Sequence, residues 1–108
     1  MPERSTQDTA VGGRVDFIVP EPGDGVGVVV AEGVQVAQEL RGWVLDTDET
    51  PTLRALDAAP FGHKIALVAL ARGETIIEYG MEIGQATAAI RKGCHVHVHN
   101  VTSKRWSK

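Results

Sequence analysis

Three of the four histidines in this chain occupy alternate positions near its C-terminal end, in the segment GCHVHVHN at residues 93–100. Successive side chains of an extended strand point to opposite faces, so the spacing predicts that His95, His97 and His99 share one face of a strand. Imidazole groups bind transition metals and change charge near neutral pH. The segment is therefore a candidate site for metal binding or proton transfer, and a solvated strand edge is the structural alternative.

Strand geometry limits how a metal ion could be held there. Positions two apart are separated by roughly 6.5 to 7 Å, given a rise of about 3.3 Å per residue. With metal–nitrogen bonds of about 2.1 Å, two of the three imidazoles can converge on one ion and three cannot. The sequence has no HExxH motif and no cysteine pair, so the remaining ligands must come from elsewhere in the fold or from another chain.

The fourth histidine lies beside a lysine in the segment FGHK at residues 61–64. The pair follows Pro60 and opens an apolar run, which places His63 and Lys64 at the mouth of a predicted strand. A histidine in that position can act as an acid or a base, and a lysine can bind a carboxylate as a point charge. A surface turn without a chemical role is the alternative interpretation of this dipeptide.

The elements that must position these residues are predicted to be short strands. Twelve glycines and five prolines in 108 residues favour tight turns over long helices. An acidic turn at residues 46–49 lies between two β-capable runs and predicts a hairpin, and residues 82–90 are expected to be extended chain and a turn. A weak repeat at residues 30–36, 70–76 and 90–96 predicts matching turns at Gly33, Gly73 and Gly93.

Length and composition favour one folded domain. A chain of 108 residues with a net charge of −3 and no basic cluster lacks the electrostatic footprint of a nucleic-acid-binding protein. It has no apolar run long enough to cross a membrane and a single cysteine, Cys94, so we expect a cytoplasmic protein. Residues 1–13 are expected to be a flexible tail, and residues 14–108 the folded domain.

Five ordered motifs carry a family resemblance. The segments GHKIAL, IIEYG, IGQATAAI, KGCHVHVHN and TSKRW follow one another across residues 15–106. In this order and spacing, the chain resembles the small domain of the altronate and galactarate dehydratase family. The resemblance implies an all-β fold, the β-clip of SAF (antifreeze-like) domains, in agreement with the short strands and glycine turns.

The resemblance also implies a function. Its members eliminate water or sulfite from a hydroxy acid such as altronate, galactarate or sulfolactate, with a divalent metal, Fe²⁺ in the usual description. It implies that this chain is a small subunit beside a large catalytic subunit, and it leaves room for a homo-oligomer when the chain is isolated. The partners implied are thus the large subunit and the carboxylate of the substrate, with no nucleic acid and no membrane.

Within that resemblance, the expected catalytic residues are His63, Lys64, His97, His99 and Asn100. We rank His97 and His99 first as metal ligands and His95 last, as the more structural of the three. A non-catalytic SAF module that docks a large partner is the alternative function, and a metal-storing or metal-sensing domain is a third.

The chain departs from the family pattern at two positions. Cys94 stands where family members usually have glutamate, and Glu78 replaces a lysine in the motif IEYG. Both are expected to alternate away from the face that carries the histidines.

Overall fold

The computed structural model describes residues 14–103. The expected tail at 1–13 and the closing residues 104–108 lie outside the described residues. Residues 14–103 contain no helix, and hence none that is long and apolar enough to cross a membrane. The all-β prediction is therefore confirmed for this range, whereas the finer assignment to the β-clip stays a prediction from the resemblance.

Short strands separated by tight turns make up the described chain. The residues between 14 and 103 form eleven strands, none longer than six residues. Their bounds are Phe17–Val19 (β1), Val26–Val29 (β2), Gly33–Val34 (β3), Glu39–Val44 (β4), Thr52–Arg54 (β5), Ala59–Pro60 (β6), Lys64–Ala66 (β7), Thr75–Glu78 (β8), Met81–Ala86 (β9), His95–Val96 (β10) and Val101–Thr102 (β11).

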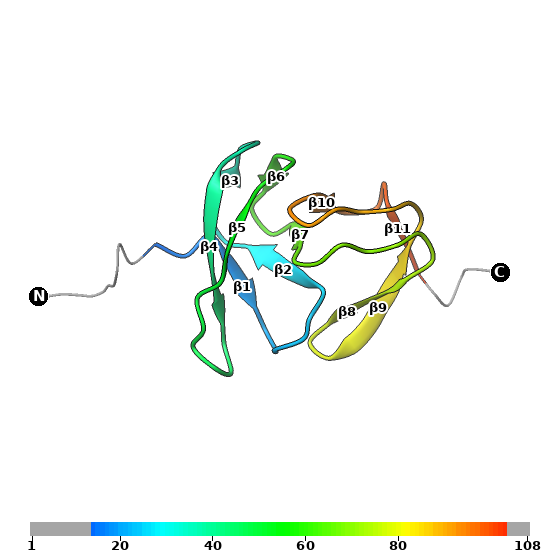
Figure 1. The fold of residues 1–108 in the computed structure, drawn as a ribbon, viewed down its shortest axis with the longest axis horizontal. Coiled ribbons are helices and arrows are strands. Elements are labelled where there is room, and N and C mark those ends of the chain that lie inside the picture. The colour runs from blue at the N-terminus through cyan, green and yellow to red at the C-terminus, as the bar shows by residue number, and fades with distance from the viewer. Residues whose placement is uncertain (1–13, 104–108) are drawn as a thin grey trace, which may run out of the picture.

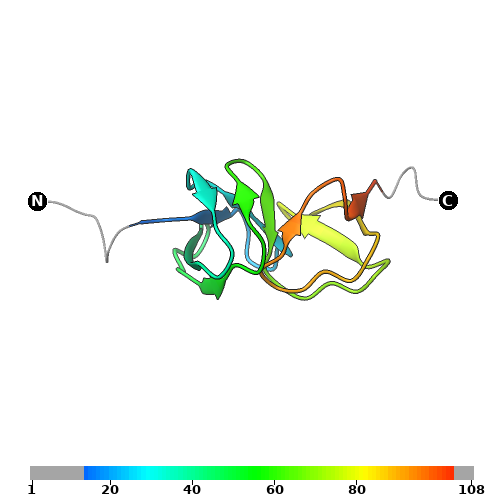
Figure 2. The ribbon, with the colours of Figure 1, turned by 90° about the horizontal axis from the view of Figure 1, so that it is seen from above.

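The strands form three sheets in two adjoining lobes. A six-stranded sheet has the order β10-β7-β2-β1-β4-β5, a second has the order β11-β9-β8, and β3 pairs with β6. Only β1 and β4 run parallel among these pairs. In Figure 1, β1 and β3–β6 lie in the left lobe and β8, β9 and β11 in the right lobe, with β7 and β10 between them. Figure 2 shows the same two lobes from above.

Two hydrophobic clusters form the core, and the middle strands contribute to both. The first cluster gathers around Phe17 in the left lobe, and the second around Ile76 in the right lobe. Within β7, Ile65 belongs to the first cluster and Ala66 to the second, because neighbouring side chains on a strand face opposite ways. The segment that begins at His63 is thus fixed at the seam between the lobes.

Tight turns of one kind recur along the chain and correct one prediction. In five turns the fourth residue donates its N–H to the carbonyl of the first, and the third residue has a positive φ. Gly73 and Gly93 occupy that third position as expected, but the prediction for Gly33 is wrong, because Gly33 lies in β3. The turn that follows the first repeat falls later, with Ala37 at its third position. The turns are 21–24, 35–38, 60–63, 71–74 and 91–94.

Two other sequence predictions are confirmed. The acidic turn at residues 46–49 joins β4 to β5 as an antiparallel hairpin, and the segment 82–90 is extended in β9 as far as Ala86 and then bends at residues 87–88. The bridge between Leu70 and Ile90 joins the second and third repeats, each of which continues into a glycine turn and a strand.

Gly93 ties three segments together at the entrance to β10. Its N–H donates to the carbonyl of Ala66 (2.9 Å), and its own carbonyl accepts from the N–H of Leu56 (2.9 Å). A Cβ atom at this position would collide with the carbonyl oxygen of Arg54. Gly93 therefore has a steric requirement in addition to its φ of 92°.

We predict that Gly93→Ala destabilises the protein more than Gly73→Ala. Gly73 has nearly the same φ, 87°, but its Cβ would meet nothing closer than Gln85 Nε2 at 3.9 Å. The Gly73 variant should lose about 1–2 kcal/mol from left-handed backbone strain alone. The Gly93 variant must also shift backbone hydrogen bonds, each of which costs about 1–3 kcal/mol when left unmade. Urea unfolding of both variants measures the difference, and equal losses would contradict the steric argument.

Candidate functional site

The pairing of β7 with β10 determines where the histidines lie. These strands are antiparallel, with His95 opposite Ile65 and Val96 opposite Lys64. One residue beyond Val96 and one residue before Lys64, the same register brings His97 opposite His63. Residues far apart in the sequence therefore meet because of strand register.

The prediction of one strand through all three C-terminal histidines is wrong. The strand β10 ends at Val96, and residues 97–100 form a turn in which Asn100 donates its N–H to the carbonyl of His97 (3.0 Å). The side-chain amide of Asn100 stabilises this turn by accepting from the N–H of His97 and donating to the carbonyl of His95, both at 2.9 Å. These local bonds compete with continued strand pairing.

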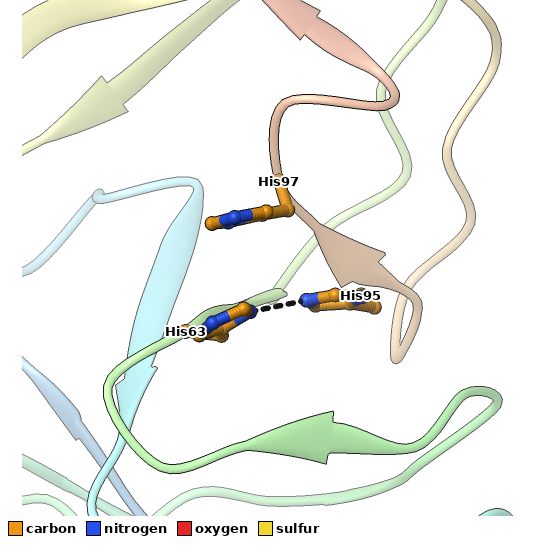
Figure 3. Close-up of side chains that lie close together, drawn as sticks. All are labelled: His63, His95 and His97. Carbon is orange, nitrogen blue, oxygen red and sulfur yellow. Dashed lines mark hydrogen bonds between the residues drawn. The ribbon is translucent and has the colours of Figure 1, made fainter.

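Three imidazole rings nevertheless cluster at the surface. His63, His95 and His97 form what we call the His triad, shown in Figure 3, in which one ligand atom of each lies within 4.8 Å of the others. His63 Nδ1 and His95 Nε2 share a hydrogen bond of 2.9 Å. The rings of His63 and His97 stack with centroids 4.1 Å apart and 15° between planes. His63 and His95 are half-buried, and His97 is exposed.

The surroundings of the triad favour the neutral form of two rings. The pKa of His95 is lowered first by partial burial and then by the neighbouring histidines, against a smaller opposing effect of Asp57. The pKa of His97 is lowered by desolvation and by His63, His99 and Lys64. Because both shifts are downward from a value near 6.5, these imidazoles are neutral at pH 7 and keep a nitrogen lone pair.

The predicted residues outside the triad occupy different positions. The ring of His99 lies 5.2 Å from that of His95, tilted by 38°, and its side chain is exposed. Asn100 uses its side chain to position His97, as described above. Asp57, which no sequence pattern indicated, accepts a hydrogen bond from the N–H of His95 (2.9 Å) and so anchors the start of β10.

A groove of about 410 Å³ adjoins the triad through His97. Lys64 and Glu78 face into it, with Lys64 Nζ 3.7 Å from Glu78 Oε1. Only one member of the triad, His97, lines this groove, so the expectation that Glu78 points away from the face that carries the histidines stays a prediction. Cys94 packs against the second core cluster.

The triad has a donor set that could hold a divalent transition metal. Neutral imidazole nitrogens are suitable ligands, and three of them leave coordination positions open, as in catalytic metal sites. Bonds of about 2.1 Å to a tetrahedral ion would place the nitrogens about 3.4 Å apart, so the stacked rings must turn toward a common point. The arrangement can thus serve metal binding or proton transfer beside a groove that contains Lys64 and Glu78.

Comparison with known proteins places this geometry in a family. Residues 15–104 match the altronate/galactarate dehydratase SAF domain. The (2R)-sulfolactate sulfo-lyase subunit alpha of Chromohalobacter salexigens is 52% identical over 92 residues, which cover 85% of this chain and 98% of that protein. The subunit of the same name from Paracoccus pantotrophus is 49% identical over 47 residues, covering 44% of this chain and 70% of that protein.

The same domain also occurs in a much longer relative. Altronate dehydratase of Escherichia coli K12 is 44% identical over 71 residues, which cover 66% of this chain and 12% of that enzyme. The resemblance seen in the five motifs is thus confirmed across nearly all of the described residues. This chain, with its His triad at the seam of two β lobes, belongs to the altronate/galactarate dehydratase SAF domain family.

Proposed function

We propose that this chain is the small subunit of a two-subunit, metal-dependent lyase that eliminates sulfite from sulfolactate or a closely similar hydroxy acid. The observation that carries the proposal is a His triad at the surface of a chain that is 52% identical to nearly the whole of a sulfo-lyase subunit alpha. The match to the SAF family supports the finer fold assignment, the β-clip, as part of the same proposal.

The reaction requires a base, charge stabilisation and a place for the substrate's anionic groups. Sulfolactate carries a proton and a hydroxyl on C2, next to the carboxylate, and a sulfonate on C3. When a base takes the C2 proton, the electron pair forms the C2–C3 double bond and the C3–S bond breaks, releasing sulfite with its bonding pair. The remaining enol then converts to pyruvate. A neutral imidazole that does not bind the metal can accept the proton, and Lys64 can pair with a substrate anion.

The chain's own residues also suit a metal cofactor. At least two of His63, His95 and His97 would hold it, and the resemblance favours Fe²⁺. When bound, such an ion would supply positive charge that stabilises the negative charge developing next to the carboxylate as the proton leaves. The downward pKa shifts keep protons from competing for the ligand nitrogens of His95 and His97 at neutral pH.

A large subunit would have to complete the site. The triad lies at an open surface, and two apolar side chains beside it are strongly exposed, Phe61 at 65% and Val98 at 81%. Apolar surface of this kind is typical of sites that a partner covers. The same surface favours the second candidate function, a non-catalytic module that only docks a partner, and variants of the triad distinguish the two.

We predict that the purified chain alone does not turn over sulfolactate, because its described residues form no enclosed site. Co-purified with its large subunit and supplied with Fe²⁺, it should release sulfite and pyruvate in equal amounts. The measurement is coupled detection of both products, with the large subunit alone as the control. Robust turnover by the isolated chain would refute the assignment as a subunit.

We predict unequal effects of the four histidines in that two-subunit enzyme. His63→Gln, His95→Gln and His97→Gln should each lower kcat by about 100-fold or more, because each removes a ligand or base of the triad. His99→Gln is the matched control and should keep most of the activity. Bound metal and melting temperature, measured for all four, separate loss of the site from loss of the fold. Wild-type kinetics in all three triad variants would leave only the docking function.

A further inference from the structure

The groove beside the triad contains charged groups that metal binding does not use. Its walls are formed by Val96, Ile83, Val98 and Val101, while Lys64, Glu78, His97 and Ser103 supply polar atoms. An apolar concave surface with a few convergent polar groups is the usual form of a small-molecule site. The question is which ligand chemistry would need a cation and a carboxylate side by side.

Lys64 and Glu78 form an ion pair but no direct hydrogen bond. The distance of 3.7 Å between Lys64 Nζ and Glu78 Oε1 is longer than the 2.7–3.2 Å of a hydrogen bond. The side chain of Glu78 is only 14% exposed, and that of Lys64 is 34% exposed. Within residues 14–103, the carboxylate of Glu78 accepts no hydrogen bond. An ion pair at this distance offsets only part of the cost of burying a carboxylate, so a ligand that also brings a hydrogen-bond donor to Glu78 would be favoured.

We propose that Lys64 and Glu78 together form a subsite for the 2-hydroxy-carboxylate end of a substrate. Lys64 donates to a carboxylate oxygen, and Glu78 accepts from the neighbouring hydroxyl. This inference rests on the proposed function, which supplies the hydroxy-acid class of substrate, and it assigns Glu78 as a residue that determines specificity.

The geometry fits such a ligand. In a 2-hydroxy acid the hydroxyl oxygen and the nearer carboxylate oxygen lie about 2.7 Å apart, close to a hydrogen-bond length. With one bond of about 2.8 Å from Lys64 and one of about 2.7 Å to Glu78, these two oxygens bridge the gap of 3.7 Å between Nζ and Oε1. A carboxylate ligand without the hydroxyl would leave Glu78 without a donor and would meet its negative charge.

The test compares two probes that differ only by that hydroxyl. Malate carries it and succinate lacks it, and both are dianions. Binding of each to the isotope-labelled full chain is followed by NMR at the residues of the groove, in the wild type, in Glu78→Gln and in Glu39→Gln. Glu39 is the matched control, since it forms an exposed ion pair of 3.8 Å with Arg54 in the other lobe.

We expect the wild type to bind the preferred malate enantiomer about tenfold more tightly than succinate, the usual value of a hydrogen bond to a charged acceptor. Glu78→Gln should reduce that ratio to about threefold or less, and Glu39→Gln should leave it unchanged. Equal binding of the two probes by the wild type, binding of neither, or an unchanged ratio in Glu78→Gln would overturn the subsite.

This outcome is independent of catalysis. Selective malate binding without sulfolactate turnover in the two-subunit enzyme would retain the subsite and refute the proposed function. Turnover of sulfolactate with equal binding of malate and succinate would retain the proposed function and refute the subsite. A purely structural role for Glu78 would change the affinity for both probes alike and leave their ratio intact.

Discussion

The antiparallel register of β7 and β10 is the constraint on which the rest of the site depends. With His95 opposite Ile65 and Val96 opposite Lys64, His97 must come to lie opposite His63. A slip of one residue would turn the side chains of β10 to the other face and separate the rings. The hydrogen bonds of Ala66 to Gly93 and Cys94 hold the register at the other end of the pair.

A buried carboxylate extends this positioning to the groove. Asp24, only 5% exposed, accepts hydrogen bonds from the N–H groups of Glu21, Tyr79 and Gly80. Tyr79 and Gly80 form the tip of the β8–β9 hairpin, both with positive φ, and Glu78 directly precedes them. The turn at residues 21–24 thereby fixes the strand that carries Glu78 against the sheet that carries Lys64. Because the carboxylate of Asp24 is buried, its hydrogen bonds to these backbone groups make the link specific.

The sequence revealed the type of fold and most of the chemistry, but not the grouping of residues. Glycine turns and short apolar alternations are local signals, so the all-β architecture, the hairpin after Val44 and the extended chain followed by a bend over 82–90 could be predicted. Strand register is a long-range property, so the meeting of His63 with His97 could not. The alternation of histidines at 95, 97 and 99 also led to a wrong prediction, because a side-chain hydrogen bond ends the strand early. Asn100 closes a turn after His97, and a strand through His99 is lost.

The contributions of Glu78 and Asp57 could not be predicted from the sequence for a related reason. The sequence shows a glutamate in place of a lysine, but only the packing of β8 against β2, the neighbour of β7 in the sheet, brings this glutamate to face Lys64. Asp57 carries no pattern at all, and its bond to the N–H of His95 exists because the loop after β5 passes the start of β10. In both cases the role of a polar residue follows from the strand that lies next to it.

The central claim is that strand register gathers three histidines of this small chain into the metal-binding part of a shared active site. A crystal structure of the two-subunit complex loaded with Mn²⁺ or Fe²⁺, with anomalous scattering to locate the ion, tests it most directly. The account predicts an ion within about 2.0–2.3 Å of nitrogens from at least two of His63, His95 and His97, with the large subunit completing the coordination. An ion held only by groups of the large subunit, with the triad out of bonding distance, would contradict it.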